Sequence, residues 1–327
     1  MQGTFGQVVK CSKISNSEPV MIKMFKKDPQ YILAAQTEVN ILNKLKRQDS
    51  EKSHMVKWYQ AFEDRAFTCL LFEHMESSLL DRMKERHPDG LDLKTIRFII
   101  KQVALALYYG KYKNIIHGDL KLENVLLVNH TAQPWTVKLF GFSQAHEVSE
   151  AHPGRSIQRC LPYRSPEITL GLPYDGAVDV WSLGCITAAL YVGEHLYPGK
   201  SPYEMLKYMT QTQGQLPDTM LNEGLDTNRF FLRDDSTGSW KLKLADPSHH
   251  EDFQETDLPL KDNGTKVLSS LQDFLKLKPL DSQSRVDEED EIGDRRMFVG
   301  LLESMLQLDA AKRLTPHKVV QHEFLRM

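Results

Sequence analysis

The chain has 327 residues, 41% of them apolar and 26% charged, which is typical of a globular protein with enough apolar material for one large domain or two lobes. Its 41 basic and 44 acidic residues give a net charge of −3, which excludes an overall attraction to nucleic acid or to an anionic membrane. The sequence has no signal peptide, no membrane-spanning run of roughly 18 apolar residues and no CxxC pair, so we expect an intracellular protein without a disulfide framework or a zinc site.

Residues 1–75 are predicted to form a small lobe made mostly of strands. A helix is predicted over residues 34–45, because Val39, Leu42 and Leu45 recur at helical spacing. Three other segments are rich in β-branched and aromatic residues and are separated by polar turns, which is typical of strands: residues 7–14, 18–25 and 67–75.

Residues 76–327 are predicted to form a larger, mainly helical lobe. An apolar face repeats at helical spacing over residues 93–110, which predicts an amphipathic helix. The segment 179–193 is apolar nearly all round, which indicates a helix buried at the centre of this lobe. Residues 234–296 are polar and acidic, and we expect them to form a surface insert before a further amphipathic helix over 297–306.

Two features of this insert have alternative interpretations. The acidic run at 287–292 is interpreted as a solvated loop, and a docking surface for a basic partner is the alternative. The segment Ser248–Asp252 contains two adjacent histidines, which suggest a metal site. We interpret them as surface residues, because no other ligand spacing supports a metal.

Two glycines and two charged residues are the first candidates for a nucleotide site. Gly3 and Gly6 lie between predicted strands, where missing side chains let backbone N–H groups approach phosphate oxygens. This signal is weak alone, because a tight hairpin also needs glycines. Lys23 on a predicted strand and Glu38 on the predicted helix strengthen it, since an ion pair between them would hold an ammonium group against nucleotide phosphates.

The segment HGDLKLEN, from His117 to Asn124, is the most specific signal for chemistry. In this spacing Asp119 can accept the proton of a substrate hydroxyl, and Lys121 can neutralise a phosphoryl group in transfer. Asn124 can hold a metal ion. A lone Asp, Lys or Asn is usually an exposed loop residue, but their order after the glycines and the charged pair predicts phosphoryl transfer.

With these motifs the sequence resembles a eukaryotic protein kinase over essentially the whole chain. The resemblance implies a two-lobed α+β fold, with a small, mainly antiparallel β lobe containing one helix and a larger helical lobe. It also implies that the first strand is missing, because the chain begins at Met1. Further segments resemble the homeodomain-interacting protein kinases, near the dual-specificity tyrosine-regulated kinases: GTFGQVVKC, QTEVNIL, HGDLKLENVLLVN, LYPGKSPYEMLKYMTQTQGQLP and TNRFFLRD.

The resemblance implies roles for further residues. The backbone of Glu73 and Met75 would face adenine beside the gatekeeper Phe72. The implied ATP-binding residues are Gly3, Gly6, Val8, Lys23, Glu38, Glu73, Met75 and Leu126. The implied structural residues are Leu42, His117 and Phe142 in an apolar spine, Asp179 beneath the catalytic loop, and Glu167 paired with Arg313.

The sequence departs from this pattern at several positions. Gly141 stands where the family has the Asp that binds magnesium, so the metal site keeps Asn124 but loses its carboxylate. Met21 replaces the usual small residue over adenine, and its longer side chain would press into the nucleotide pocket. Between Phe142 and Pro162 there is no Tyr, so the tyrosine that this family phosphorylates on itself has no counterpart.

Two functions are therefore compatible with the sequence. The first is a Ser/Thr protein kinase that uses ATP and a weakened magnesium site, and whose phosphoryl transfer is strongly slowed by Gly141. The second is a pseudokinase that binds protein partners, with or without nucleotide. The resemblance implies protein substrates or partners, transcription regulators among them, and favours the nucleus over the cytoplasm. No direct nucleic acid or membrane partner is expected.

Overall fold

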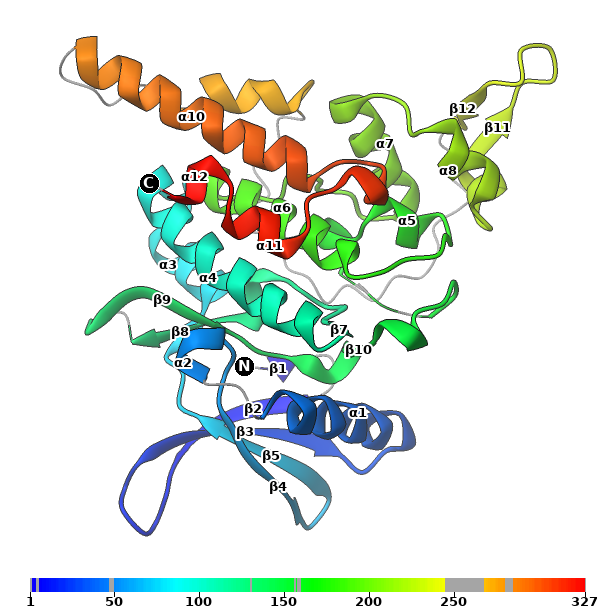
Figure 1. Ribbon diagram of the computed structural model, residues 1–327. Coiled ribbons are helices and arrows are strands. Elements are labelled where there is room, and N and C mark those ends of the chain that lie inside the picture. Colours follow the sequence, from blue (N-terminus) through cyan, green and yellow to red (C-terminus); the bar gives the residue numbers. More distant parts are fainter. Residues whose placement is uncertain are drawn as a thin grey trace.

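The computed structural model describes residues 2–3, 6–46, 50–129, 131–155, 157, 160–244, 268–279 and 285–326. A small lobe built on an antiparallel sheet lies below a larger, mainly helical lobe (Figure 1). The two-lobed α+β fold predicted from the sequence is confirmed. No helix in these described ranges is long and apolar enough to cross a membrane.

The sheet of the small lobe has the strand order β1-β2-β3-β5-β4. Its strands are β1 (Gln2–Gly3), β2 (Gly6–Ser12), β3 (Pro19–Lys26), β4 (Trp58–Asp64) and β5 (Phe67–Glu73). The three predicted strands correspond to β2, β3 and β5. The sequence does not predict β4, because its last five side chains are exposed and no buried face repeats along it. At the edge where the resemblance implied a missing strand, β1 pairs with β2 over two residues.

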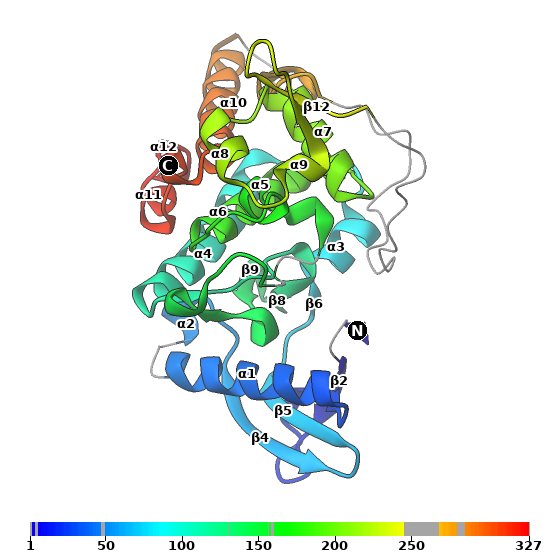
Figure 2. The same cartoon turned by 90° about the vertical axis from the view of Figure 1, so that its right-hand side faces the viewer.

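Helix α1 (Pro29–Leu45) contacts β3 and β5 of this sheet on one side and the larger lobe on the other (Figure 2). It begins at Pro29 rather than at the predicted residue 34, and proline is well tolerated in the first turn of a helix. The buried residues along it recur at helical spacing and include Ala34, Ala35, Ile41, Leu42 and Leu45. A short helix, α2 (Ser50–Ser53), follows.

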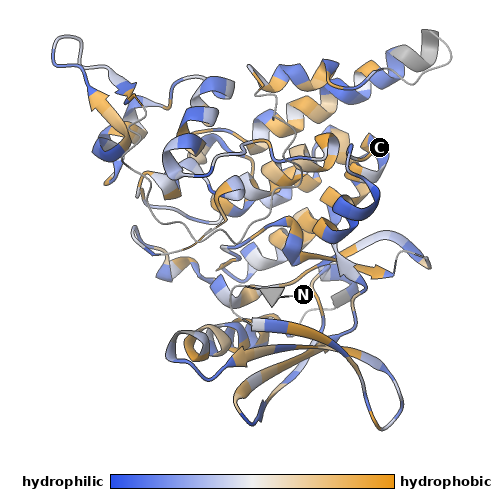
Figure 3. Ribbon diagram, turned by 180° about the vertical axis from the view of Figure 1, so that it is seen from behind, coloured by the Kyte–Doolittle hydropathy of each residue, from blue (hydrophilic) through white to orange (hydrophobic). Residues whose placement is uncertain are grey.

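The larger lobe is built around helix α6. Every residue from Val178 to Tyr191 in α6 is buried, as its all-round apolar sequence predicts. Hydrophobic residues lie mainly on the interior helices of this lobe (Figure 3). The helices are α3 (Leu79–Arg86), α4 (Leu93–Tyr112), α5 (Pro166–Thr169), α6 (Ala177–Val192), α7 (Pro202–Gln213), α8 (Asp218–Glu223), α9 (Thr227–Phe230), α10 (Arg285–Met305), α11 (Pro316–Val320) and α12 (Glu323–Arg326).

Short strands and 3-10 turns connect these helices. The strand pairs are β6-β8-β9 in one sheet, β7 with β10, and β11 with β12. Their bounds are β6 (Ser77–Ser78), β7 (Ile115–Ile116), β8 (Val125–Asn129), β9 (Gln133–Leu139), β10 (His146–Glu147), β11 (Phe231–Arg233) and β12 (Trp240–Leu242). The 3-10 turns are η1 (Leu122–Asn124), η2 (Phe142–Gln144), η3 (Val148–Glu150), η4 (Leu161–Tyr163), η5 (Leu271–Lys276) and η6 (Ala310–Lys312).

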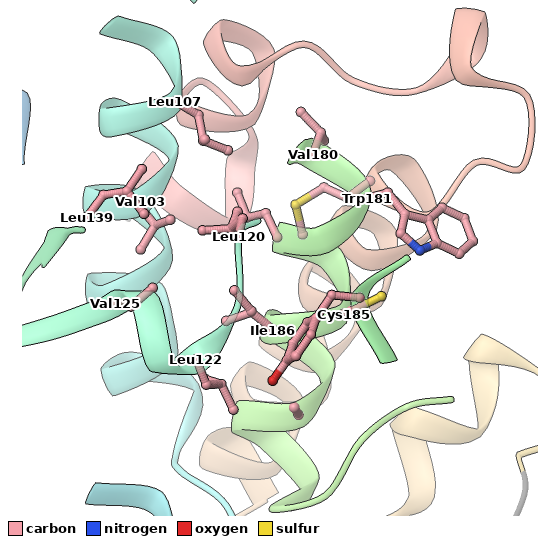
Figure 4. Close-up of a cluster of buried hydrophobic side chains, with 14 of the residues drawn as sticks. Val103, Leu107, Leu120, Leu122, Val125, Leu139, Val180, Trp181, Cys185 and Ile186 are labelled. Carbon is pink, nitrogen blue, oxygen red and sulfur yellow. The ribbon is translucent and has the colours of Figure 1, made fainter. Parts of the chain in front are cut away.

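The loop between β7 and β8 is anchored by its own sequence. Leu120 and Leu122 are buried and point into the hydrophobic core between α4 and α6 (Figure 4). Asp119 and Lys121 alternate with these leucines and are only partly buried. Burial of the two leucines therefore anchors the loop that carries the two polar side chains.

The expected surface insert, residues 234–296, is only partly a surface loop. The acidic run at 287–292 lies within helix α10, so the prediction of a loop is wrong. The helix begins at Arg285, twelve residues before the predicted start at 297, because acidic residues are good helix formers near a helix N-terminus. Arg295 is buried and donates to the backbone carbonyls of Leu275, Lys278 and Pro279, which joins helix α10 to η5 and the segment after it within this insert. The segment Ser248–Asp252 lies outside the described residues.

Candidate active site

A buried ion pair joins the small sheet to helix α1. The Lys23 ammonium on β3 lies 2.6 Å from a Glu38 carboxylate oxygen on α1, and both side chains are at least nine-tenths buried. The other Glu38 oxygen accepts a hydrogen bond from the Phe142 N–H at 3.2 Å. Glu38 therefore connects Lys23 to the start of the segment that follows Gly141. The rings of Phe25 and Phe140 lie within 4.9 and 5.3 Å of the ammonium.

Asp179 on α6 holds the loop after β7 from beneath. Its two carboxylate oxygens accept the backbone N–H groups of His117 and Gly118 at 2.7 and 2.9 Å. Gly118 has φ +72°, a conformation that costs glycine little. Burial raises the pKa of Asp179. The nearby His117 and the hydrogen bonds from the two backbone N–H groups act in the opposite direction and lower it. The sequence placed Asp179 below this loop, and its side chain lies there.

His117 is a neutral side chain in this arrangement. Its Nε2 lies 3.0 Å from the Phe140 carbonyl and its Nδ1 accepts the Asp119 N–H, which assigns the proton to Nε2. Burial lowers the pKa of His117. The ring packs edge-on against Phe142, with centroids 5.0 Å apart. Leu42 on α1 is buried in the same core as Phe142, so the three predicted spine residues share one apolar region with the site.

Asp119, Lys121 and Asn124 lie close together in the loop between β7 and β8. The Lys121 ammonium is 3.7 Å from an Asp119 carboxylate oxygen. The Asn124 amide donates to the Asp119 backbone carbonyl at 2.7 Å and to its carboxylate at 3.1 Å. The loop thus presents one carboxylate that is held by an amide and lies near an ammonium group, which is a geometry suited to accepting a hydroxyl proton beside a phosphoryl group.

Gly141 has no side chain, and Asn124 fills the space beside it. The backbone of Gly141 is left-handed, with φ +84°. A Cβ placed there would lie 2.5 Å from the Asn124 Oδ1, closer than any real contact. The Asn124 side chain therefore occupies the region into which a side chain at position 141 would extend.

The residues at this point do not fit a tightly held magnesium ion. Magnesium prefers near-octahedral oxygen ligands and is usually bound through one or two carboxylates beside substrate phosphates. Position 141 supplies none, and Asp119 is already bonded to Asn124. Within the described ranges, no group of three or more acidic, histidine or cysteine side chains could hold a metal ion.

The residues expected around adenine are almost completely buried. Met21 lies two positions before Lys23 on β3, so both side chains lie on the same face of the strand. Met21, Phe72, Met75 and Leu126 are each 1% exposed. Val8 on β2 is partly buried against the same core. Lys10 on β2 donates to the backbone carbonyl of Glu76, so it reaches across to the segment that joins the lobes. Buried apolar side chains therefore line the region where the resemblance implies adenine.

Gly6 is explained by packing in the small lobe. A Cβ at Gly6 would lie 2.1 Å from the backbone oxygen of Met24 on β3, so only glycine allows this approach. Gly3 of β1 is in register with Gly6 of β2. Contact of these glycines with phosphate stays a prediction.

A second buried ion pair lies at the base of the larger lobe. The Arg313 guanidinium contacts both oxygens of Glu167 at 2.6 and 3.0 Å, and it also donates to the carbonyls of Ala177 and Gln307. Both side chains are 2% exposed or less. The resemblance to kinases implied this pair, and the two side chains contact each other directly.

Sequence reasoning missed one charged residue near the site, Lys138 on β9. Its side chain is 2% exposed and contacts the carboxylates of Glu73 and Glu51. A lysine inside the apolar strand sequence TVKLF is the signal that could have identified it, because a lysine in such a strand is buried only with a partner.

Comparison with known proteins gives a consistent result. A family model described as the protein kinase domain matches residues 2–325. Homeodomain-interacting protein kinase 1 of Mus musculus is 41% identical over 326 residues, homeodomain-interacting protein kinase 1 of Caenorhabditis elegans 36% over 340, and homeodomain-interacting protein kinase 4 of Homo sapiens 33% over 336. Each match covers the whole of this chain but only 27%, 39% and 54% of the respective relative.

Proposed function

Because the chain belongs to the protein kinase family, we propose that it is a Ser/Thr protein kinase domain whose ATP-dependent phosphoryl transfer is strongly slowed. One observation carries this proposal. The Lys23–Glu38 pair and the loop from Asp119 to Asn124 are assembled, whereas Gly141 has no carboxylate beside them. We place the division between the lobes near residue 75, between the small sheet and α3.

The proposed chemistry uses three residues of the chain. Asp119 accepts the proton of a substrate Ser or Thr hydroxyl, and Lys121 neutralises charge on the phosphoryl group. Lys23, held by Glu38, binds the phosphates of ATP. A magnesium ion would supply charge neutralisation in such a reaction, but the residues beside Asn124 do not fit a tightly held ion. Loss of one preorganised electrostatic group commonly slows a reaction by about 10² to 10³.

A second candidate is a pseudokinase that acts through protein partners. Met21, Met75 and Leu126 are each 1% exposed, and this burial favours a domain that binds nucleotide weakly or not at all. The relatives are named for interaction with homeodomain proteins, so we propose transcription regulators as substrates or partners. For the same reason we propose a nuclear location.

Transfer of labelled phosphate from ATP to Ser- and Thr-containing peptides tests the proposal. We expect slow transfer by the wild-type domain and none by Asp119→Asn, which keeps the shape of the side chain but removes its basicity. Equal transfer by both proteins would overturn the proposed chemistry.

Thermal unfolding with ATP alone, and with ATP and magnesium, separates the two candidates. A ligand at about 100 times its dissociation constant stabilises a protein by roughly 2.7 kcal/mol, which is easily measured. Stabilisation by ATP together with Asp119-dependent transfer supports the weak kinase. Absence of both stabilisation and transfer supports the pseudokinase without nucleotide.

A further inference from the structure

Lys138 is a buried cation at the junction of three elements. It lies on β9 and its side chain is 2% exposed. The ammonium contacts both carboxylate oxygens of Glu73 at 3.0 Å and one oxygen of Glu51 at 2.6 Å. Glu73 ends β5, and Glu51 lies in α2. One side chain therefore joins the end of the small sheet, the segment after α1 and the strand that leads to Gly141.

The network is held together by charge. A buried ammonium group is costly unless it is paired and hydrogen-bonded. Burial acts to lower the pKa of Lys138, but the carboxylates of Glu51 and Glu73 raise it above its usual value. Lys138 is therefore charged in the folded protein. Of its two partners, Glu73 is the more enclosed, because its side chain is 19% exposed and that of Glu51 is 71% exposed.

Glu73 is fixed by its backbone as well as by Lys138. Its N–H donates to the Lys57 carbonyl at 3.0 Å, and its carboxylate accepts the Lys57 N–H at 2.5 Å. Residues 73–76, which we call the hinge segment, then run from the small lobe to the larger one. The segment ends with the Glu76 N–H bonded to the Leu127 carbonyl on β8 at 2.8 Å. Both ends of the hinge segment are thus tied to backbone.

The strand that carries Lys138 lies beneath the same region. Lys138 is in register with Leu126 on β8, one of the residues expected to bind ATP. The next residue, Leu139, accepts the Val56 N–H at 2.9 Å and donates to the His54 carbonyl at 2.7 Å. Strand β9 is therefore hydrogen-bonded to residues 54–56, which directly precede Lys57, the partner of Glu73. From β9 the Lys138 side chain reaches Glu73 at the start of the hinge segment.

We infer that Lys138 is a positioning residue that sets the place of the hinge segment, and with it the backbone groups of Glu73 and Met75 offered to adenine. This inference rests on the proposed function, which assigns those two backbones to adenine. Lys138 itself touches no reacting group. It acts through Glu73, whose carboxylate it holds at a fixed distance from β9.

Hydrogen exchange and nucleotide binding together test this role. Lys138→Met keeps a long unbranched side chain and removes its charge, so the Glu73 carboxylate loses its cation. We expect the amides of Lys57 and Glu73 to exchange faster by about tenfold or more, while the amides of α4 keep their rates. We expect the dissociation constant for ATP, measured in excess chelator, to rise by a similar factor of about ten.

Matched variants identify the partner that matters. Glu73→Gln should reproduce the faster exchange, and combining it with Lys138→Met should add little, because both changes break the same contact. Glu51→Gln is the control, since its carboxylate is mostly exposed, and it should leave both measurements near wild type. Lys138→Arg keeps the charge and should restore part of the ATP affinity.

The outcomes separate this inference from the proposed function. Unchanged exchange at the amides of Lys57 and Glu73 in Lys138→Met would overturn the positioning role. Equal acceleration there and in α4 would also overturn it, because such a result indicates a general loss of stability. If Lys138→Met does not fold, Glu73→Gln decides the same question. If the wild-type domain binds no ATP, the nucleotide-dependent function fails, and the exchange rates alone decide whether Lys138 positions the hinge segment.

Discussion

At the scale of single residues, the candidate active site depends on the residue types at positions 141 and 21. Gly141 removes a carboxylate, and the Asn124 side chain lies in the space that a side chain at 141 would need. Met21 adds volume above the region expected for adenine. Under the proposed function the first change would weaken metal binding and the second would weaken nucleotide binding, so the two effects can be tested separately.

Gly141→Asp should restore a carboxylate but with a local cost. Asp is one of the few residues other than glycine that adopts a left-handed backbone, so φ +84° is tolerable. The Asn124 side chain must move, and we expect a loss of about 1 kcal/mol in the free energy of unfolding. Magnesium should then increase the stabilisation by ATP, measured by thermal unfolding. No added effect of magnesium would show that Asn124 has not made room.

Met21→Ala should improve nucleotide binding. The smaller side chain opens space on the face of β3 that also carries Lys23, so adenine displaces less apolar volume. We expect the dissociation constant for ATP to fall about tenfold, at a cost of about 2 to 5 kcal/mol in stability for a buried methionine. Calorimetric titration measures the binding. Unchanged affinity would show that Met21 already moves aside freely.

At the scale of elements, local patterns predicted those helices and strands that have one buried face. Strand β3 and helix α4 match the predictions within two or three residues, because their buried residues alternate or recur at helical spacing. Strand β4 has no buried face, and the start of α10 is polar, so neither could be predicted from hydrophobic spacing. Their positions depend on neighbours that are distant in the sequence.

Helix α4 offers a test of local sequence control. The Asp92 side chain caps its first turn by accepting the Thr95 N–H at 2.8 Å. Asp92→Ala should lower the free energy of unfolding by about 1 kcal/mol, because an N–H at the helix start loses its acceptor. Asp92→Ser, which can still cap the helix, should lose much less. Urea denaturation measures both, and equal losses in the two variants would contradict capping as the cause.

At the scale of the whole molecule, pairs of distant residues hold the lobes and the site together. Several of these pairs match residues singled out in the sequence, such as Lys23 with Glu38 and Glu167 with Arg313. Motif order identified Lys23 and Glu38, and the resemblance to kinases implied Glu167 and Arg313. Neither could identify the contact of Lys138 with Glu73 or the position of Asn124 beside Gly141, because these depend on how side chains fill space.

The pair of Glu167 and Arg313 should be important for global stability. Arg313→Met leaves the Glu167 carboxylate buried without its cation, which commonly costs about 3 to 5 kcal/mol. The neighbouring Lys312 is 70% exposed and pairs only with Asp309 in the contacts described, so Lys312→Met is a matched control that should cost less than about 1 kcal/mol. Urea denaturation compares them, and similar losses would contradict the importance of burial.

Two buried histidines and one half-buried histidine predict how stability depends on pH. Burial lowers the pKa values of His54, His117 and His146 below the usual 6.5. Because the folded-state pKa values are depressed, the stability they contribute is present above pH 6.5 and is lost as the pH falls through the folded values. The free energy of unfolding should therefore decrease between pH 7.5 and pH 5.5. A flat or rising profile would contradict neutral histidines in the folded state.

The burial of Met21 also has a consequence for chemical probes of this domain. Under the proposed function, flat heteroaromatic compounds that mimic adenine would meet the Met21 side chain, which is 1% exposed, and would lose affinity by displacing it. A compound whose ring system leaves space for the Met21 side chain would instead gain contact with its flexible thioether. Such a compound would distinguish this domain from kinases with a small residue above adenine, and it would report occupancy of the site without any need for turnover.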